Sequence, residues 1–357
     1  MKRLFSALLF VSVILSFSPQ TKSVRRATFV AVGDNLIHTS VYKGAQTGAG
    51  FDFSPVYAAV AKAISSADIA FVNQETMLGE SNFSGYPRFC SPAGVGSALV
   101  GAGFDVINIA NNHSLDMGEE GFIYTNAVLS EMAERVIGDG GVKTVERNGI
   151  VIAFLSYTYA TNYGLSPIVS RFDEARVRAD MNEARRVADA VVVSMHWGVE
   201  YDTPRYVECF EPTAAQKDAA TLLCSLGADV IIGTHPHVIE RVEWIESEGN
   251  RTLCAYSLGN FVSNMRYGAT CLGGMLTLDF VKTDSGMIVK KPKIIPIVCH
   301  YDINHRGHTV LMLKDYTDEL AALHGTQSEG NERPFCRKTL VEIYENNIAP
   351  EFRAEEY

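Results

Sequence analysis

The stretch Ala27-Thr28-Phe29-Val30-Ala31-Val32-Gly33-Asp34-Asn35 decides the fold. Its first six residues form a short, mainly apolar run without strict alternation, which is typical of a strand buried on both faces. The same pattern, an apolar run followed at once by a polar motif, recurs at Asp68–Val72 before Asn73-Gln74-Glu75, at Phe104–Ala110 before Asn111-Asn112-His113, at Ala190–Met195 before His196-Trp197-Gly198, and at Asp229–Ile232 before Gly233-Thr234-His235-Pro236-His237. Because sites in layered α/β folds form at the carboxyl ends of strands, we expect these motifs to meet at one edge.

Helical patterns separate several of these strands. Ser54 and Pro55 begin a helix that runs to Ser65, with Ser54 as its N-cap. Asp116 and Glu119 form a capping-box pattern before another helix, which favours a capping role for Asp116 over a ligand role. Further helices are predicted from about Ala93 to Gly101–Gly103, at Asp173–Val187 and at Pro212–Leu226.

Turn residues between apolar runs predict three hairpins. Asn148-Gly149 separates Val142–Glu146 from Ile150–Ser156, and Asn-Gly at such a position is a strong hairpin signal. Two more turns are predicted at Glu248-Gly249-Asn250 and at Thr283–Gly286. Strand–helix units followed by hairpins favour an α/β fold with two packed mixed β-sheets flanked by helices.

The amino terminus predicts export. Lys2 and Arg3 precede an apolar stretch from Leu4 to Phe17, the order found in secretory signals. The sequence leaves open whether this segment is cleaved or kept as a membrane anchor. We therefore divide the chain into a leader or anchor with linker (1–26), a main domain (27–300) and a C-terminal helical extension (301–357), with helices near Leu313–His324 and Arg337–Glu345.

Composition excludes some functions. The 357-residue chain carries a net charge of −10 and no basic tract beyond its amino terminus, which argues against a nucleic-acid partner. Its seven cysteines include no Cys-x-x-Cys pair, so a thiolate zinc site is not indicated. Cys254 and Cys299 lie in apolar runs and are predicted to be core thiols.

The pair His235 and His237 is the strongest chemical signal. Pro236 favours an extended conformation for the residue before it, and side chains two apart in an extended chain point the same way. Both imidazoles are therefore expected to face one cavity as metal ligands. The alternative is a loop with two incidental histidines, which is costly if they are buried without partners.

Two carboxylates follow strand ends and suit a divalent metal. Asp34 is a natural hard ligand for Mn, Mg, Fe or Zn, although a turn or cap role is also common for Asp. Glu75 is positioned to bridge two ions, although a lone Glu is more often solvated. Oxygen and imidazole donors at one edge indicate a site for one or two divalent ions.

Asn112, His113 and His196 complete the candidate centre. Asn112 offers a carbonyl ligand, and His113 is a candidate proton donor to a leaving group. His196 follows a buried strand and is a third imidazole ligand. The alternatives are a turn role for Asn112 and core positions for the two histidines.

Four further residues are candidates for the rim of the site. Asn260 closes a hairpin after the histidine pair and is suited to orient a ligand or bind substrate, although turn chemistry also explains it. Glu200, Tyr201 and Arg88 are weaker candidates for substrate contact.

Taken in order, these motifs resemble the bacterial capsule synthesis protein family, the CapA or poly-γ-glutamate synthesis type. The resemblance covers about Thr28 to Ile297 and includes His196-Trp197-Gly198-x-Glu200-Tyr201 and Tyr256-Ser257-Leu258-Gly259-Asn260-Phe261. It implies a calcineurin-like metallophosphoesterase fold in an exported or membrane-anchored protein.

The resemblance also implies a ligand set. One metal would be held by Asp34, Glu75 and His237, the other by Glu75, Asn112, His196 and His235, with His113 as proton donor. This chain departs from the wider pattern because Leu36 stands where the first His is expected, and Glu75 replaces the usual bridging Asp. His38 would compensate only if the chain turns there.

Three functions remain open at this point. The first is a metal-dependent hydrolase or transferase acting on a capsule polymer or its precursor, a phosphorylated or acyl substrate. The second is a metallophosphatase or phosphodiesterase unrelated to capsule. The third is a non-enzymatic subunit that works with membrane polymer-synthase subunits and binds anionic polymer in the cleft.

Overall fold

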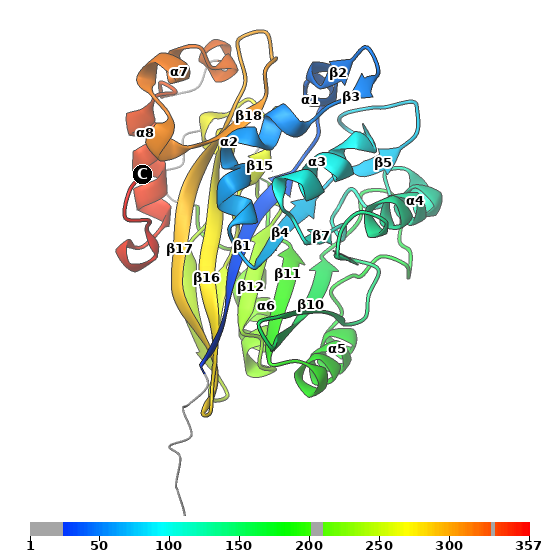
Figure 1. Ribbon diagram of the computed structural model, residues 1–357, viewed down its shortest axis with the longest axis vertical. Helices are drawn as coiled ribbons and strands as arrows, with labels where there is room; N and C mark the ends of the chain where they lie inside the picture. Colours follow the sequence, from blue (N-terminus) through cyan, green and yellow to red (C-terminus); the bar gives the residue numbers. More distant parts are fainter. Residues whose placement is uncertain (1–23, 201–209, 330–332) are drawn as a thin grey trace, which may run out of the picture.

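The computed structural model describes residues 24–200, 210–329 and 333–357 (Figure 1). The predicted export segment at Leu4–Phe17, Tyr201 and Cys209 lie outside these residues. Within the described ranges, no helix is both long and apolar enough to cross a bilayer.

The larger sheet has eight strands in the described chain. Its order is β18-β17-β16-β1-β4-β7-β8, and β15 also pairs with β1. β1 runs parallel to β4, β7 continues that parallel half, and β16 and β17 form an antiparallel half. The strands are β1 (Arg25–Asn35), β4 (Ile69–Gln74), β7 (Val106–Asn108), β8 (Arg135–Ile137), β15 (Asn260–Val262), β16 (Leu272–Thr283), β17 (Gly286–His300) and β18 (Thr309–Met312).

The second sheet is also mixed, with the order β13-β14-β12-β11-β10-β9. Its centre is parallel and its outer pairs are hairpins. The predicted Asn-Gly hairpin is confirmed, since Asn148 and Gly149 turn the chain at φ of 53° and 73° between β9 and β10. The strands are β9 (Lys143–Arg147), β10 (Ile150–Thr158), β11 (Ala190–His196), β12 (Val230–Thr234), β13 (Val242–Ser247) and β14 (Asn250–Ala255).

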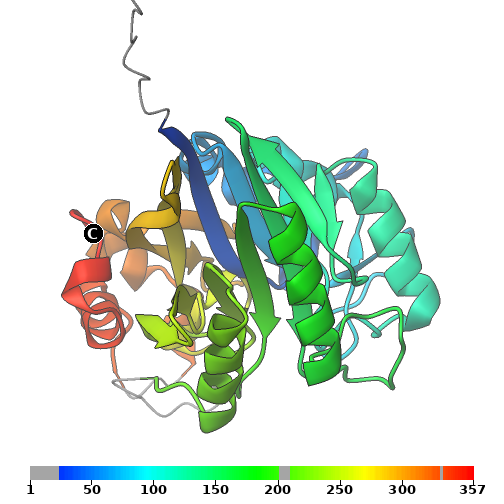
Figure 2. The ribbon, with the colours of Figure 1, turned by 90° about the horizontal axis from the view of Figure 1, so that it is seen from below.

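The two sheets pack face to face and helices cover their outer faces (Figure 2). Phe29 of β1 meets Phe154 of β10 across the interface, with ring centroids 6.2 Å apart. Helices α2 (Ser54–Ser65), α3 (Gly94–Ala102) and α4 (Gly118–Ser130) cover the larger sheet, and α5 (Glu174–Val187) and α6 (Ala214–Ser225) cover the second. The predicted α/β fold with two packed mixed sheets flanked by helices is confirmed.

Short elements sit above the carboxyl ends of the first strands. They are α1 (Thr39–Gly44), the ribbon of β2 (Gln46–Thr47) with β3 (Gly50–Phe51), and the parallel pair of β5 (Met77–Gly79) with β6 (Cys90–Pro92).

The chain after residue 300 joins the same body. β18 extends the larger sheet, and Tyr344 of the last helix donates from its hydroxyl to the carbonyl of Ile294 in β17. After β18 come η2 (Leu313–Asp315), α7 (Asp318–Ala322), η3 (Gly325–Ser328), α8 (Arg337–Asn347) and η4 (Pro350–Phe352). One further short helix, η1 (Gly268–Cys271), precedes β16. The helix predicted at Leu313–His324 is shorter than expected, because Thr317 caps a new start by accepting the Leu320 N–H.

Two capping predictions were wrong. The side chain of Ser54 does not cap α2; the helix is preceded by Phe53, and Asp52 accepts the Ser54 N–H instead. Asp116 does not cap α4 either, because its carboxylate accepts the Phe89 N–H from a distant loop. Cys254 and Cys299 are buried as predicted, and the six cysteines of the described chain are all free thiols.

Candidate metal centre

Asp34 stands at the carboxyl end of β1 and is fully buried. Gly33 before it allows β15 to approach, since a Cβ at Gly33 would lie 1.9 Å from the Gly259 carbonyl oxygen. Asp34 Oδ1 accepts from Asn73 Nδ2 at 2.7 Å, and Oδ2 lies 3.2 Å from His237 Nδ1. Burial alone would raise the pKa of Asp34, but these hydrogen bonds lower it overall, so the side chain is an anion.

Glu75 follows β4 and is the unusual group of the site. It is fully buried, and neither carboxylate oxygen has a hydrogen-bond partner. Oε1 lies 3.7 Å from His237 Nε2 and 3.8 Å from His196 Nε2. Burial, with Asp34 and Glu200 nearby, raises the pKa of Glu75 well above its ordinary range. Burial without a partner is costly for a carboxylate, and a bound cation would compensate that cost.

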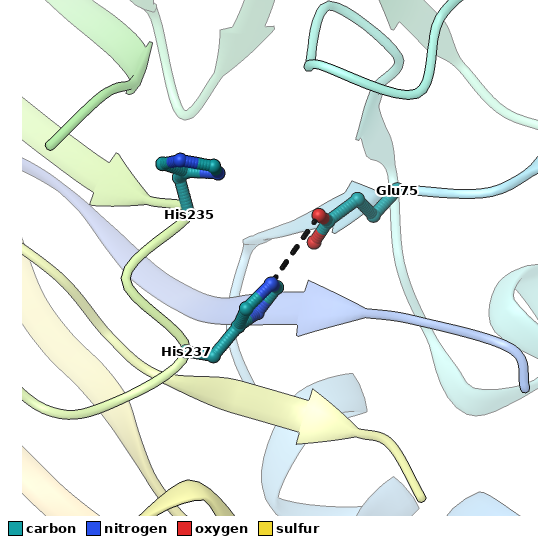
Figure 3. Close-up of side chains that lie close together, drawn as sticks. All are labelled: Glu75, His235 and His237. Atoms are coloured by element: carbon teal, nitrogen blue, oxygen red, sulfur yellow. Dashed lines mark ion pairs between the residues drawn. The ribbon is translucent and has the colours of Figure 1, made fainter. Parts of the chain in front are cut away.

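His235 and His237 both face Glu75 (Figure 3). The extended backbone predicted for this segment is wrong, because φ is +101° at His235 and +59° at His237. The cause is tertiary: the His235 N–H donates to Asp34 Oδ2 at 3.2 Å, which turns the chain after β12. The imidazoles nevertheless lie close together, with ring centroids 6.0 Å apart, and both come within reach of Glu75.

The two imidazoles have opposite electrostatic environments. Burial lowers the pKa of His235 to about 3, and its Nδ1 atom is buried without a partner. Burial also opposes the charged form of His237, but the adjacent Asp34 carboxylate raises the pKa of His237 overall. His235 therefore keeps a free lone pair that suits a metal ligand.

His196 ends β11 and is oriented from both sides. Its Nδ1 lies 2.9 Å from Thr234 Oγ1, and its Nε2 lies 2.9 Å from Asn112 Oδ1. Burial, with His235 and His237 nearby, lowers the pKa of His196 well below its ordinary range. The ring is therefore neutral, as a metal ligand must be.

These side chains form two groups that share Glu75. In the described chain, one group of ligand atoms within 4.8 Å of one another comes from Glu75, His235 and His237, and another from Asp34, Glu75 and His196. The Glu75 oxygens and His235 Nδ1 are buried without hydrogen-bond partners, and these atom types are common ligands of divalent cations. The donors present therefore fit one or two divalent ions, and Glu75 belongs to both groups.

His113 lies beside these groups and belongs to neither. Its Nδ1 is 2.8 Å from Asp116 Oδ2, and its ring meets Phe89 edge-on at 4.7 Å. His113 and His237 line one pocket of about 470 Å³, together with Leu36, His38, Phe89 and Glu200 among others.

Three of the four residues predicted at the rim are described, and they occupy different places. Asn260 Oδ1 lies 3.0 Å from His237 Nδ1, so Asn260 orients a candidate ligand. Glu200 Oε1 lies 3.8 Å from His235 Nδ1, at the edge of the centre. The guanidinium of Arg88 is turned away, donating through Nε and Nη2 to the carbonyl of Asp116 and lying 4.7 Å from the centre of the Tyr163 ring.

The sequence analysis did not assign an orienting role to two buried residues beside the candidate ligands. Asn73 donates to Asp34 Oδ1 and accepts from Asn108 Nδ2 at 2.7 Å. The Asn73-Gln74-Glu75 motif did not indicate this role for Asn73. Asp116 orients His113, a contact that its capping-box spacing concealed. Leu36 lines the pocket where the wider pattern has a histidine.

The fold and the candidate ligand groups agree with the architecture that the resemblance implies. Two packed mixed sheets carry carboxylate and imidazole side chains that come together in groups able to hold a metal ion. The family model "Bacterial capsule synthesis protein PGA_cap" matches residues 28–265, and the chain belongs to this family.

Curated relatives agree with this assignment. The chain is 31% identical over 210 residues to the PGA biosynthesis protein CapA of Bacillus subtilis, a match that covers 55% of this chain and 51% of that protein. It is 31% identical over 189 residues to the capsule biosynthesis protein CapA of Bacillus anthracis, covering 48% and 43%. The chain thus spans about half the length of these relatives.

Solved structures with a similar fold include two nucleotidases. A putative 5′-nucleotidase from Staphylococcus aureus matches with a TM-score of 0.47 and 13% identity, over 76% of this chain and 54% of that chain. A 5′-nucleotidase from Candida albicans matches with a TM-score of 0.42 and 10% identity, over 70% and 46%.

Proposed function

We propose that this chain is an exported or membrane-anchored protein of capsule or poly-γ-glutamate biosynthesis or export, with a site for metal-dependent hydrolysis or group transfer. Membership of the capsule synthesis family supports the process. The basic residues Lys2 and Arg3 before the apolar stretch Leu4–Phe17 support export. The proposed partners are membrane polymer-synthase subunits and an anionic polymer or a phosphorylated or acyl precursor.

The observation that carries the proposal is the state of Glu75. A fully buried carboxylate without one hydrogen bond is rare in folded proteins, because its desolvation is not compensated. The imidazoles of His237 and His196 stand 3.7 and 3.8 Å from the same oxygen, beyond hydrogen-bond distance. This arrangement serves a cation and is unfavourable without one.

The proposal assigns a role to each residue of the candidate metal centre. Glu75 would contribute to both candidate ligand groups, with His235 and His237 in one and with Asp34 and His196 in the other. Asn112, whose Oδ1 lies 2.9 Å from His196 Nε2, is a further candidate ligand. These groups differ from the pairing that the resemblance implies, which places His237 with Asp34 and His235 with His196. A divalent ion bound there would act as a Lewis acid toward a phosphoryl or acyl centre. Asn73, Thr234 and Asn260 fix the orientation of Asp34, His196 and His237. His113, held by Asp116, would give a proton to the leaving group.

Metal content tests the proposal. We would purify the full chain, reconstitute it separately with Mn, Fe, Zn or Mg, and count bound ions by elemental analysis. Wild type should hold one or two ions, and Glu75→Gln should lose them. The matched control is Glu240→Gln, which changes another buried glutamate that accepts from Gln216 at 2.7 Å. Equal metal content in wild type and Glu75→Gln would rule out the metal role of Glu75.

Two other functions are favoured by particular observations. The pocket beside His113 would also serve a phosphatase or phosphodiesterase unrelated to capsule. Turnover of an aryl phosphate, abolished in His235→Ala, would support this function. Leu36 at an expected ligand position favours a non-enzymatic, polymer-binding subunit, for which anion binding without turnover is the expected result.

A further inference from the structure

His38 lines the pocket but belongs to neither group of candidate ligands in the described chain. Its ring meets Phe89 edge-on with centroids 5.3 Å apart, and Phe89 meets His113 edge-on at 4.7 Å. Phe89 therefore separates two imidazoles that face the same space. One of them, His113, has a proposed role, and His38 has none.

The hydrogen-bond partners of His38 indicate which ring nitrogen carries the proton. Nδ1 lies 3.1 Å from the Asn264 N–H and 3.2 Å from the Leu36 carbonyl oxygen. The Leu36 carbonyl has a donor without His38 Nδ1, since it accepts the His38 backbone N–H at 3.0 Å. Among the described residues, the Asn264 N–H has no acceptor other than Nδ1. An N–H can only donate, so Nδ1 carries the lone pair and the hydrogen sits on Nε2.

Nε2 of His38 is thus a donor without an acceptor. Among the described residues, His38 makes its ring hydrogen bonds through Nδ1 alone. Burial lowers the pKa of His38 to about 4, so the ring is neutral at pH 7 and offers one N–H. A neutral donor at the wall of a pocket matches an oxygen of a bound anion.

The segment at residues 301–308 fixes Asn264. Asn264 Oδ1 lies 3.1 Å from His305 Nδ1 and 3.0 Å from His308 Nε2. Both imidazoles stack on Tyr301, with centroids 5.2 and 5.1 Å away, and the Tyr301 hydroxyl donates to the carbonyl of Met265 at 2.7 Å. This segment follows the family-matched range 28–265. It nevertheless positions Asn264, whose backbone N–H donates to His38.

We propose that His38 is a substrate-binding residue whose Nε2–H donates to an oxygen of the substrate's phosphoryl or carboxylate group. The segment at residues 301–308 holds it in this tautomer through Asn264. The inference rests on the proposed function, since it assigns the pocket to the substrate. It makes His38 a substrate contact and not a replacement for the histidine missing at Leu36.

The tautomer is tested first, because it depends on neither metal nor turnover. ¹⁵N-histidine NMR of the metal-free full chain should show His38 protonated at Nε2, with the signal assigned by its loss in His38→Gln. His308→Gln keeps a donor to Asn264, and His308→Phe removes it. We expect a single tautomer in the former and a mixture in the latter. A proton on Nδ1 overturns the inference, and an unchanged His38 signal in His308→Phe overturns the role of the 301–308 segment.

Anion binding tests the substrate contact. Inorganic phosphate and glutarate are titrated by calorimetry into Mn²⁺-reconstituted wild type, His38→Ala and His38→Gln, and the better anion identifies the phosphoryl or carboxylate source. We expect about tenfold weaker binding in His38→Ala, the scale of one lost hydrogen bond to a charged group. His38→Gln should stay within about threefold, because its side-chain N–H reaches the position of Nε2.

The controls separate this inference from the proposed function. Both variants should keep the metal content of wild type, since His38 lies outside the ligand groups. Equal affinities in wild type and His38→Ala overturn the contact. A wild type that binds neither anion also overturns it, and the metal analysis then shows whether the metal centre itself has failed.

Discussion

His113 Nδ1 lies 2.8 Å from Asp116 Oδ2, and the same carboxylate oxygen accepts the Phe89 N–H at 2.6 Å. One buried carboxylate therefore orients both the candidate proton donor and the aromatic ring beside it. Since Nδ1 faces Asp116, the other nitrogen of His113 is left for the pocket that this residue lines.

The first prediction concerns this pair. His113→Ala should lower kcat for an aryl phosphate about 10²- to 10⁴-fold, the usual contribution of a positioned general acid. Asp116→Asn should lower kcat less and shift its pH profile, because the donor remains but loses its anionic partner. Metal content should not change in either variant. Full activity in His113→Ala would remove His113 from the reaction.

The second prediction concerns backbone strain at His235, where φ is +101°. Glycine adopts this conformation freely and alanine does not, and both substitutions remove the imidazole. His235→Gly should therefore be more stable to urea than His235→Ala by about 1 kcal/mol, measured without metal. The reverse order would show that the loop relaxes once the ring is gone.

The strands show how far the sequence could predict the fold. β4 and β11 are buried at every residue, so their continuous apolar runs gave a clear signal. β8 is short and lacks such a run. β18 is also short, and its apolar run Val310 to Met312, at the edge of the sheet, is fully buried only at Val310. Their pairing depends on neighbours that are distant in sequence, which no local pattern contains.

The sequence could predict which residues form the candidate site, but not which hydrogen bonds they make. Parallel pairing places Asp34 and Glu75 at one edge of the larger sheet, and His196 and His235 at one edge of the second sheet. The packing of the two sheets brings these edges together. The turn at His235 depends on Asp34, which lies 201 positions earlier in the chain. Asp116 became a partner of His113 because the loop before β6 brings the Phe89 N–H to it. Such long-range hydrogen bonds overrode two local rules, extension before proline and the capping box.

The third prediction is a pH effect away from the centre. Burial raises the pKa of Glu240 from 4.5 to about 7, with the hydrogen bond from Gln216 opposing the shift. Because the pKa of Glu240 is higher in the folded state, its contribution to the free energy of unfolding is fully present below pH 4.5. This contribution is lost as the pH rises through about 7. Between these limits wild type should lose about 3 kcal/mol relative to Glu240→Gln, at about 1.4 kcal/mol per pKa unit. Denaturant unfolding of both proteins at several pH values measures the difference, and parallel curves would contradict it.

The fourth prediction concerns metal removal. A metal that binds only the folded chain at 100 times its Kd stabilises it by about 2.7 kcal/mol, so chelation should lower the Tm of wild type. Glu75→Gln should melt at the same temperature with or without chelator. Without metal it should also melt above wild type near pH 7, because it lacks the buried, unpartnered carboxylate. A Tm of Glu75→Gln below that of metal-free wild type would indicate that Glu75 has a partner in solution.

The fifth prediction concerns the position of the missing histidine. Leu36 follows Asp34 by two residues, pairs through its N–H with the Val262 carbonyl at 2.8 Å, and lines the pocket with His237. Because Leu36 lines the same pocket as His237, an imidazole at position 36 would lie close to the candidate ligand groups. Leu36→His should lower the Kd for Mn²⁺ at least about tenfold, since even indirect partners of metal ligands contribute that much.

Leu36→Met is the control for this variant, because it preserves volume and adds no nitrogen donor. Without metal, Leu36→His should be less stable than Leu36→Met, since its imidazole is buried without a partner. With metal this order should reverse, and the reversal distinguishes a new ligand from a change in packing. If both variants bind Mn²⁺ as wild type does, Leu36 points away from the ions, and the departure from the wider pattern has no bearing on how many ions the site holds.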